Sequence, residues 1–437
     1  MKINNIGNIQ KLRIWTLSPL HIGDGTEFDP TAFWIDESRN ELNEFDASTL
    51  FEKLSQEQKN KILTLCQKAD IFSLQEIMKT VNAAKPQSIR KISVSPEIVS
   101  NYKRILNNQN QNEMGKFQIK KTIVNPNSNR AYISGSSLKG AIRTALIADL
   151  SKKNGQFKDA VDTTFKASDF ISRDEVKTTI GLVDRVSKKM DKKKGGFKHM
   201  AVTMLESINA NSIFNGSISL NENVEQILNA LEAYSISIIE DSEIGIKSPS
   251  KLGIEKVKNA FKNKTYLCRL GGYIGAESHT IEGYRSIAIK TQTGFKNREH
   301  TTRLLYSTPT KQKSNSDNTT FGWCLIEVVN ENDDTDIQAI RNLIASMQPK
   351  QSTQSFNSSV SKSVQNQNSV KNINQKKLQA NKEYSGIVSE KRTKNGGYFI
   401  KVQNYGEKPL MNYTGKDLNA GVQIKVKFTG AGFQIIE

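Results

Sequence analysis

The segment Tyr-Ile-Ser-Gly-Ser-Ser-Leu-Lys-Gly-Ala-Ile-Arg-Thr, residues 132–144, decides how this sequence is interpreted. Strand-like residues at 119–124 and 131–133 lead into it. The Gly-Ser-Ser stretch supplies a sharp turn and side chains that cap helices. Beyond it, apolar residues recur at helical intervals, at Leu138, Ile142, Leu146 and Leu150. We therefore expect a strand, a tight loop and a helix.

The start of this helix is suited to anions, because exposed first-turn amides can hold a phosphate. Lys139 and Arg143 lie four residues apart and share one helix face. The segment does not match GxxxxGK[ST], which argues against nucleotide hydrolysis. An ordinary capped helix packed on a sheet explains the same residues equally well. The candidate phosphate contacts here are Gly135, Ser136, Ser137, Lys139, Gly140 and Arg143.

Two further glycine loops follow strand-like residues. Leu-Ser-Pro-Leu-His-Ile-Gly-Asp-Gly, residues 17–25, ends an alternating strand at 11–17. Arg-Leu-Gly-Gly-Tyr-Ile-Gly, residues 269–275, follows a strand at 266–270. A sugar-phosphate chain could approach the backbone closely at either loop, although plain turns explain them too. The candidates are His21, Gly23, Gly25, Gly271, Gly272 and Gly275.

Cationic residues gather at two other places. Residues 187–196, between strand-like residues 180–186 and 200–208, are typical of a long hairpin with a cationic tip, or simply of a solvated turn. The lysines that could contact RNA there are Lys188, Lys189, Lys192, Lys193 and Lys194. Near the C-terminus, cations adjoin aromatic side chains, as in platforms for single strands. The candidates there are Lys391, Arg392, Lys394, Tyr398 and Phe399. Tyr398 and Phe399 are consecutive in an expected strand, so only one can face a ligand.

The remaining pattern indicates an α+β fold with an added module. Residues 48–112 have helical spacing and are expected to form a helical insertion. Residues 349–381 contain mainly Ser, Gln, Asn, Lys and Val and have too little apolar surface to order, so we expect a flexible linker. Residues 382–437 show short alternating strands with glycine turns, typical of a small barrel.

Composition narrows the class of partner. The net charge is +18, of which residues 351–437 carry +8. Such an excess favours an anionic partner, because lysine and arginine release counterions when they neutralise phosphates.

The cysteines and the apolar pattern indicate the compartment. Three cysteines, Cys66, Cys268 and Cys324, are an odd number and lie far apart, which favours a reducing compartment. Without a membrane-length apolar run or a signal sequence, we expect a cytoplasmic protein that contacts no membrane. We find neither HExxH nor GxSxG, no metal-ligand cysteine cluster, and only four scattered histidines, so we expect no catalytic residue, metal or cofactor.

Taken together and in order, the three glycine-bearing motifs resemble the RAMP proteins of type III CRISPR systems. The insertion and the ending Phe-Gly-Trp-Cys-Leu-Ile, residues 321–326, are similar to the fifth subunits of type III-A Csm complexes. The resemblance covers about residues 8–345. Ser134 departs from it, since a proline usually precedes the Gly-Ser-Ser.

This resemblance implies two ferredoxin-like, RRM-like RAMP halves, residues 1–221 with the insertion and residues 222–348, followed by an OB or S1-like barrel. It implies a non-catalytic subunit that binds crRNA and caps the complex backbone at the crRNA 3′ side. It would support crRNA maturation and antiviral defence. Its implied partners are crRNA, the neighbouring RAMP backbone subunit, other Csm subunits and host trimming nucleases. Residues 188–196 would correspond to a thumb-like hairpin.

Two other functions remain open. One is a metal-assisted ribonuclease of the backbone type, in which Asp24 or Asp29 promotes cleavage of target RNA. Carboxylates in glycine-containing loops are, however, commonly turn formers. The other is a purely protein-binding role, in which residues 384–437 recruit a trimming nuclease and contact no RNA.

Overall fold

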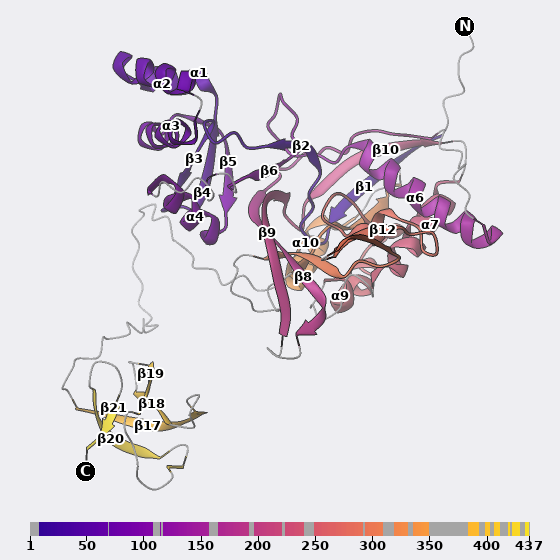
Figure 1. Cartoon of the computed structure of the whole chain (residues 1–437). Coiled ribbons are helices and arrows are strands. Elements are labelled where there is room, and N and C mark those ends of the chain that lie inside the picture. The colour runs from indigo at the N-terminus through magenta and orange to yellow at the C-terminus, as the bar shows by residue number, and fades with distance from the viewer. Residues whose placement is uncertain are drawn as a thin grey trace, which may run out of the picture. The chain divides into compact units, whose positions relative to one another are not determined.

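The computed structural model describes residues 8–68, 70–107, 114, 117–156, 165–191, 196–220, 223–239, 249–291, 293–308, 319–330, 335–348, 383–392, 398–402, 406–410, 418–419, 422–428 and 433–436. The chain divides into two compact units, residues 1–354 and 355–437 (Figure 1). The expected linker at 349–381 lies outside the described residues.

A five-stranded antiparallel sheet forms the centre of the first unit. Its order is β11 (Thr265–Arg269), β16 (Trp323–Val328), β1 (Asn8–Thr16), β10 (Ile213–Leu220) and β7 (Lys166–Ala167). β11 and β16 lie in the expected second half of the chain, and the other three lie in the first. The two expected RAMP halves are therefore joined by backbone pairing in one sheet.

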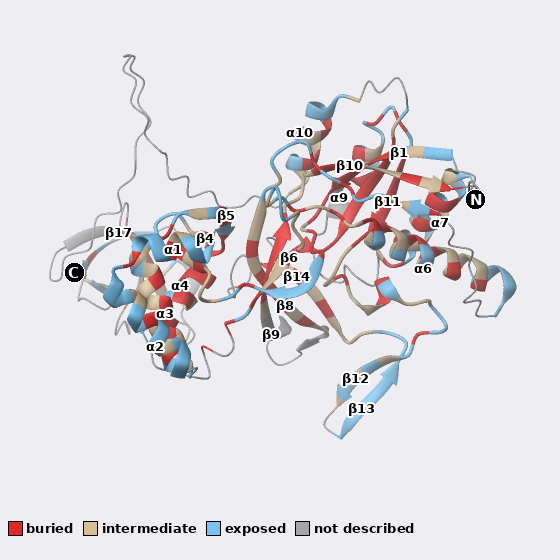
Figure 2. Ribbon diagram, turned by 90° about the horizontal axis from the view of Figure 1, so that it is seen from above, coloured by how far each residue is buried: buried red, intermediate tan, exposed pale blue. Residues whose placement is uncertain are grey.

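Helices cover both faces of this sheet. α6 (Gly135–Asn154) and α7 (Val224–Ser237) lie on one side, and α9 (Pro249–Lys258) and α10 (Ile337–Met347) lie on the other (Figure 2). Because side chains alternate along a strand, Leu12 and Ile14 of β1 pack toward α6, whereas Trp15 packs toward α10. The sheet is thus the middle of three layers.

A second, mixed sheet carries the insertion. Its order is β2 (Gly23–Glu27), β6 (Ile119–Thr122), β9 (Gly196–Ile208), β8 (Thr178–Asp191), β5 (Ser88–Val94), β4 (Glu41–Phe45) and β3 (Phe33–Asp36), and β14 (Arg303–Thr308) pairs with β8 and with β15 (Thr319–Thr320). The helices of the insertion are α1 (Ala47–Lys53), α2 (Gln56–Lys68), α3 (Ile71–Ala84) and α4 (Pro96–Asn107).

Two expectations need correction here. The insertion at 48–112 is not purely helical, because β5 lies within it and pairs with β4 and β8. Arg90, Ile92 and Val94 alternate inward along β5, and the buried arginine hides that period in the sequence. Residues 23–25, expected as a loop, begin strand β2.

Further elements complete the two units. η1 (Ala276–His279) leads to a two-stranded sheet of β12 (Ile287–Thr291) and β13 (Gly294–Arg298). The second unit has five antiparallel strands in the order β19 (Gly406–Pro409), β18 (Tyr398–Val402), β17 (Glu383–Arg392), β20 (Gln423–Phe428) and β21 (Phe433–Ile435). The chain is therefore a mixed α/β protein with an all-β C-terminal unit. Within the described parts of the chain, no helix is long and apolar enough to span a bilayer.

Candidate nucleic-acid interface

Three segments far apart in the sequence meet in one open cleft of about 470 Å³. They are the turn after β1, the first turns of α6 and the loop after β11. Eight of the expected contacts line it: His21, Gly23, Gly25, Ser136, Ser137, Gly140, Gly271 and Gly272. The structure thus brings the three glycine motifs together.

The sheet explains why the motifs at residues 17–25 and 269–275 meet. β1 and β11 both run antiparallel to β16, so their C-terminal ends lie at the same end of the sheet. Thr16 and Cys268 lie on either side of Cys324 in this register. The turn and the loop that follow are therefore neighbours, and the Gly272 N–H donates to the carbonyl oxygen of His21 at 2.7 Å.

His21 is a buried hydrogen-bond acceptor in the wall of the cleft, with 4% of its surface exposed. Its Nδ1 lies 2.7 Å from the carbonyl oxygen of Glu206. A carbonyl oxygen only accepts, so Nδ1 carries the proton and Nε2 of the neutral ring is an acceptor. Burial lowers the pKa of His21, which favours this neutral form. The Tyr273 ring packs edge-on against it at 5.5 Å.

Three of the expected glycine contacts are needed for packing within the protein. A Cβ on Gly271, whose φ is +84°, would lie 2.3 Å from the His21 carbonyl oxygen. One on Gly23 would lie 2.8 Å from His21 Nε2, and one on Gly135 would lie 2.4 Å from the carbonyl oxygen of Ala167. The space beside these three glycines is therefore filled by the protein itself.

Gly140 is different, because its surroundings are open. It lies inside α6, is exposed and lines the cleft, and a Cβ there would have no atom within 4 Å other than those of its chain neighbours and its own helix backbone. A glycine inside a helix costs roughly 1 kcal/mol relative to alanine. Ser136, one helical turn earlier, and Thr144, one turn later, extend this small-residue face along the cleft. The fold does not require glycine at 140, and its absence of a side chain leaves room in the cleft.

The first turn of α6 offers fewer free amides than the sequence suggested. The Gly135 N–H donates to the Asp169 carboxylate at 2.8 Å, and the Ser137 N–H donates to the Ser134 carbonyl at 3.0 Å. The Ser134 and Ser137 hydroxyls lie 2.8 Å apart. The Ser136 hydroxyl donates to the Ser134 hydroxyl at 3.0 Å. The side of this turn that faces the cleft therefore offers mainly the hydroxyls of Ser136 and Ser137, both of which are hydrogen-bonded to Ser134.

Comparison with known protein families shows to which family this chain belongs. A model of the RAMP superfamily matches residues 13–408. The chain belongs to the RAMP superfamily. Curated protein sequences give no match.

Two solved structures are similar to this RAMP protein. One is a chain of a Csm-crRNA-target RNA ternary complex of a type III-A CRISPR-Cas system, with 15% identity over 73% of this chain and 100% of that chain and a TM-score of 0.47. The other is Csm5 of T. onnurineus, with 16% identity over 71% of this chain and 99% of that one and a TM-score of 0.38.

The expected cations of α6 lie outside the cleft lining. Lys139 is half-buried, and its Nζ lies 5.4 Å from the centre of the Phe165 ring. Arg143 is exposed. Both precede a cleft-lining residue, Gly140 or Thr144, by one position, so they occupy the adjacent helix face. Gly275, at the end of the third motif, also lies outside the cleft lining.

The cationic hairpin is only partly described. Lys188, three residues before the end of β8, is largely buried, and its Nζ lies 3.1 Å from the Glu277 carboxylate. This lysine therefore joins β8 to η1. Lys189 belongs to β8, but its side chain is outside the described residues, as are Lys192, Lys193 and Lys194 entirely.

Each of the two carboxylates of the ribonuclease alternative accepts hydrogen bonds from the threonine two positions later. Asp24 accepts from the Thr26 N–H at 2.9 Å and from its hydroxyl, and Asp29 accepts from the N–H and hydroxyl of Thr31, both at 2.8 Å. Slight burial opposes ionisation of Asp24, but the Thr26 hydrogen bonds outweigh it and lower its pKa. Neither carboxylate lines the cleft. Among the residues that the structure describes, no three His, Cys, Asp or Glu side chains gather as metal ligands.

In the C-terminal unit, the structure distinguishes the two aromatic candidates. Tyr398 packs against the core of this unit, and its hydroxyl accepts from the Leu418 N–H at 3.0 Å. Because neighbours in a strand alternate, Phe399 points to the opposite face, where it is partly exposed. Lys391 and Arg392 lie in β17 without described side chains, and Lys394 lies outside the described residues.

Nine residues of the cleft lining were not predicted from the sequence, and Arg269 and Tyr273 are two of them. Arg269 is 5% exposed; its Nε donates to the Phe321 carbonyl at 3.0 Å, and its guanidinium lies 4.8 Å from the Trp323 ring centre. Tyr273 has a φ of +60°, which is uncommon for a residue with a side chain. Both belong to the motif at residues 269–275, in which only the glycines were predicted to be contacts.

Proposed function

We propose that this chain is a non-catalytic crRNA-binding subunit of a type III-A Csm effector complex. The observation that carries RNA binding is the cleft built from the three glycine motifs, with Gly140 left open at its wall. Open, small-residue surfaces let a sugar-phosphate backbone approach closely, whereas large side chains would hold it away. The hydroxyls of Ser136 and Ser137 would exchange their hydrogen bonds with Ser134 for bonds to phosphate oxygens there.

His21 would supply a contact that distinguishes RNA from DNA. The ribose 2′-hydroxyl can donate a hydrogen bond, and DNA lacks that donor. The neutral His21 ring has Nε2 as an acceptor, because Nδ1–H already donates to the Glu206 carbonyl. Such a contact reads the sugar and not the base, in keeping with recognition of shape and backbone.

Charge compensation would come from residues around the cleft. Lys139 and Arg143 lie on the α6 face beside the cleft, and the chain carries a net charge of +18. Phosphate contacts of this kind orient an RNA without reading its sequence. The bound RNA would accordingly show strong salt dependence.

The place in the complex rests on membership of the RAMP superfamily and on the motif resemblance. We infer that the subunit caps the backbone at the crRNA 3′ side, contacts a neighbouring RAMP subunit and supports maturation by trimming nucleases in the cytoplasm. The first unit would contain ferredoxin-like halves. The five antiparallel strands of the second unit suit a partly open OB or S1-like barrel, which Phe399 could use for stacking.

RNA binding is tested with a matched pair of double variants on one helix. Lys139→Ala with Arg143→Ala removes two cations beside the cleft, and Lys152→Ala with Lys153→Ala removes two exposed cations from the far end of α6. In filter binding with single-stranded RNA, the first pair should lower the slope of log affinity against log salt by about 1.4. The second pair should leave it nearly unchanged. Equal affinity and slope for wild type and the first pair would refute the proposal.

A further inference from the structure

The β12–β13 hairpin stands apart from both sheets of the first unit. Its strands pair with each other over five residue pairs and, within the described residues, with no other strand. Figure 2 shows it projecting from the body as an exposed ribbon. A two-stranded ribbon is at best marginally stable alone in water. Its order therefore depends on an anchor at its base, and its surface is available to a ligand.

The composition of this ribbon favours an anionic, stackable ligand. Residues 287–298 contain Lys290, Lys296 and Arg298 but no carboxylate. Phe295 is 74% exposed, the highest value for a large hydrophobic side chain in the described residues. Phe295 lies directly opposite Lys290 in the register, so ring and ammonium group share one face of the hairpin.

A protein partner fits this surface less well than RNA. The centres of protein interfaces are depleted in lysine and contain several apolar side chains together. Here a single aromatic ring projects among cations. Aromatic rings beside lysine or arginine are what proteins use to stack bases and hold phosphates of single strands. The charge and the lone ring thus both suit single-stranded RNA.

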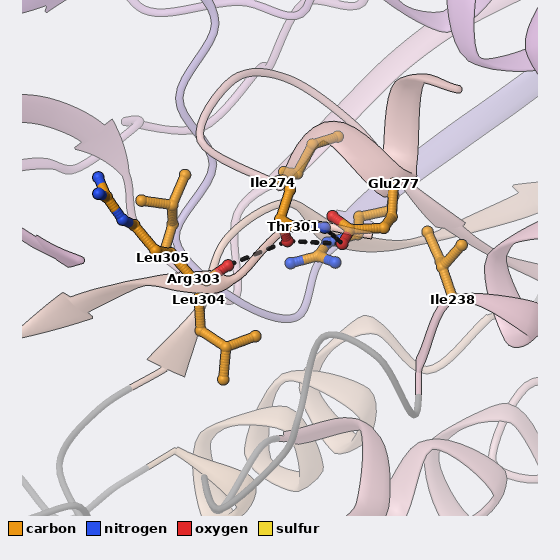
Figure 3. A pocket seen from close by; sticks show the side chains of 9 residues that line it. Ile238, Ile274, Glu277, Thr301, Arg303, Leu304 and Leu305 are labelled. Atoms are coloured by element: carbon orange, nitrogen blue, oxygen red, sulfur yellow. Dashed lines mark hydrogen bonds between the residues drawn. The ribbon is translucent and has the colours of Figure 1, made fainter. Parts of the chain in front are cut away.

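The anchor of the hairpin is the Glu277 carboxylate. The N–H and hydroxyl of Thr301 donate to it at 2.7 and 2.5 Å, which closes the chain segment that carries the hairpin (Figure 3). Lys188, near the tip end of β8 in the β8–β9 hairpin, lies 3.1 Å from the same carboxylate. Burial opposes ionisation of Glu277, but the hydrogen bonds from Thr301 and the charge of Lys188 outweigh it, and its pKa is lowered. One buried anion therefore holds both hairpins.

This anchor also adjoins the cleft. Ser278 and His279 follow Glu277 directly and line the cleft, and the chain then continues to β12 at Ile287. An RNA strand that leaves the cleft on this side would next meet the hairpin. We propose that β12–β13 is a second binding element for single-stranded RNA, in which Phe295 stacks on a base and Lys290 contacts the adjoining phosphate. Lys296 and Arg298 on the opposite face add to the positive potential.

This inference rests on the proposed function, because the hairpin is taken to extend the path of an RNA held in the cleft. The test uses the full chain and oligouridine of about 20 nucleotides in which single positions carry 2-aminopurine. Phe295→Ala should weaken binding by about 5- to 20-fold and abolish quenching of one 2-aminopurine position. Phe295→Trp should restore both. Phe72→Ala, at an exposed phenylalanine of α3, is the matched control and should change neither.

The outcomes separate the inference from the proposed function. If wild-type protein binds no RNA, the proposed function fails and the hairpin inference fails with it. If Gly140→Gln in the cleft weakens binding but Phe295→Ala changes neither affinity nor quenching, the cleft stands and the inference is wrong. If Phe295→Ala leaves RNA binding intact but prevents incorporation into a reconstituted complex, the hairpin binds a protein, and the inference is also overturned.

Discussion

Replacing Gly140 with alanine should make the protein more stable and its RNA binding weaker. Gly140 lies inside α6, and alanine is the better helix former by roughly 1 kcal/mol. Apart from its chain neighbours and the backbone of its own helix, no atom lies within 4 Å of the position that the new Cβ would take, so no clash offsets this gain. Unfolding free energy should therefore rise by about 0.5–1 kcal/mol, and amide exchange in α6 should slow by about 2- to 5-fold.

The same methyl group would occupy the cleft. Gly140 shares the cleft with Ser136 and Ser137, which precede it by one helical turn. A backbone in contact with these hydroxyls would have to move outward by about the radius of a methyl group. We expect a loss of affinity of about 3- to 10-fold, or about 0.7–1.4 kcal/mol. Gly140→Gln should lose more affinity than alanine yet remain more stable than glycine, because glutamine is also a good helix former.

The assay pairs urea unfolding and amide exchange with filter binding of single-stranded RNA at fixed salt. Lys152→Ala, near the end of the same helix, controls for a general effect of changing α6. The reasoning predicts opposite signs for stability and affinity in both Gly140 variants. If both variants are stabilised and bind RNA as tightly as wild type, the open wall of the cleft is not an RNA contact.

Three further outcomes concern the cleft and the carboxylates near it in sequence. Because burial lowers the pKa of His21, the unfolded state takes up a proton before the folded state as pH falls below about 6.5. Stability should therefore decline as pH falls below about 6.5, with His21 contributing at most about 1.4 kcal/mol per pH unit, and His21→Gln should remove that share in urea unfolding. Gly271→Ala should lower the unfolding free energy by about 3 kcal/mol, since it forces a side chain into a positive φ and against a carbonyl; a loss below 1 kcal/mol would contradict the packing. In a reconstituted complex, Asp24→Ala and Asp29→Ala should leave target cleavage unchanged, and a loss with either would favour the ribonuclease alternative.

Much of the first unit followed from local patterns in the sequence. The α6 helix, strands β1 and β11 and the ends of β8 and β9 have regular apolar spacing, which sequence reasoning can detect. β5 was missed because a buried arginine, Arg90, occupies one of its inward positions. Its charge is matched by Glu44 and Glu206, which come from other strands. Such compensation is a tertiary property that local spacing does not report.

The sequence predicted which motifs form the site, but it did not predict what each residue of those motifs does. The three glycine motifs do meet, yet the sequence could not say which glycines serve packing and which leave open space. Gly271 and Gly140 look alike in sequence, but one abuts a carbonyl oxygen and the other faces the cleft. Likewise Lys188 looked like one lysine of a cationic run. Its partner Glu277 is 89 positions away in sequence, and only the fold brings the two together.

The distribution of charge separates two contributions to RNA binding. His21 in the cleft wall is neutral, and Arg269 is buried against Phe321 and Trp323, so the cleft itself presents little free charge. The exposed Arg143 lies on the adjacent face of α6. Release of counterions, and with it the salt slope, should therefore depend on residues such as Arg143, whereas the shape of the cleft sets affinity at any given salt. Gly140→Ala should accordingly lower log affinity by the same amount at every salt concentration, so that the slope of log affinity against log salt does not change. A change of slope in that variant would mean that the cleft holds phosphates by charge, and the division of roles would have to be reversed.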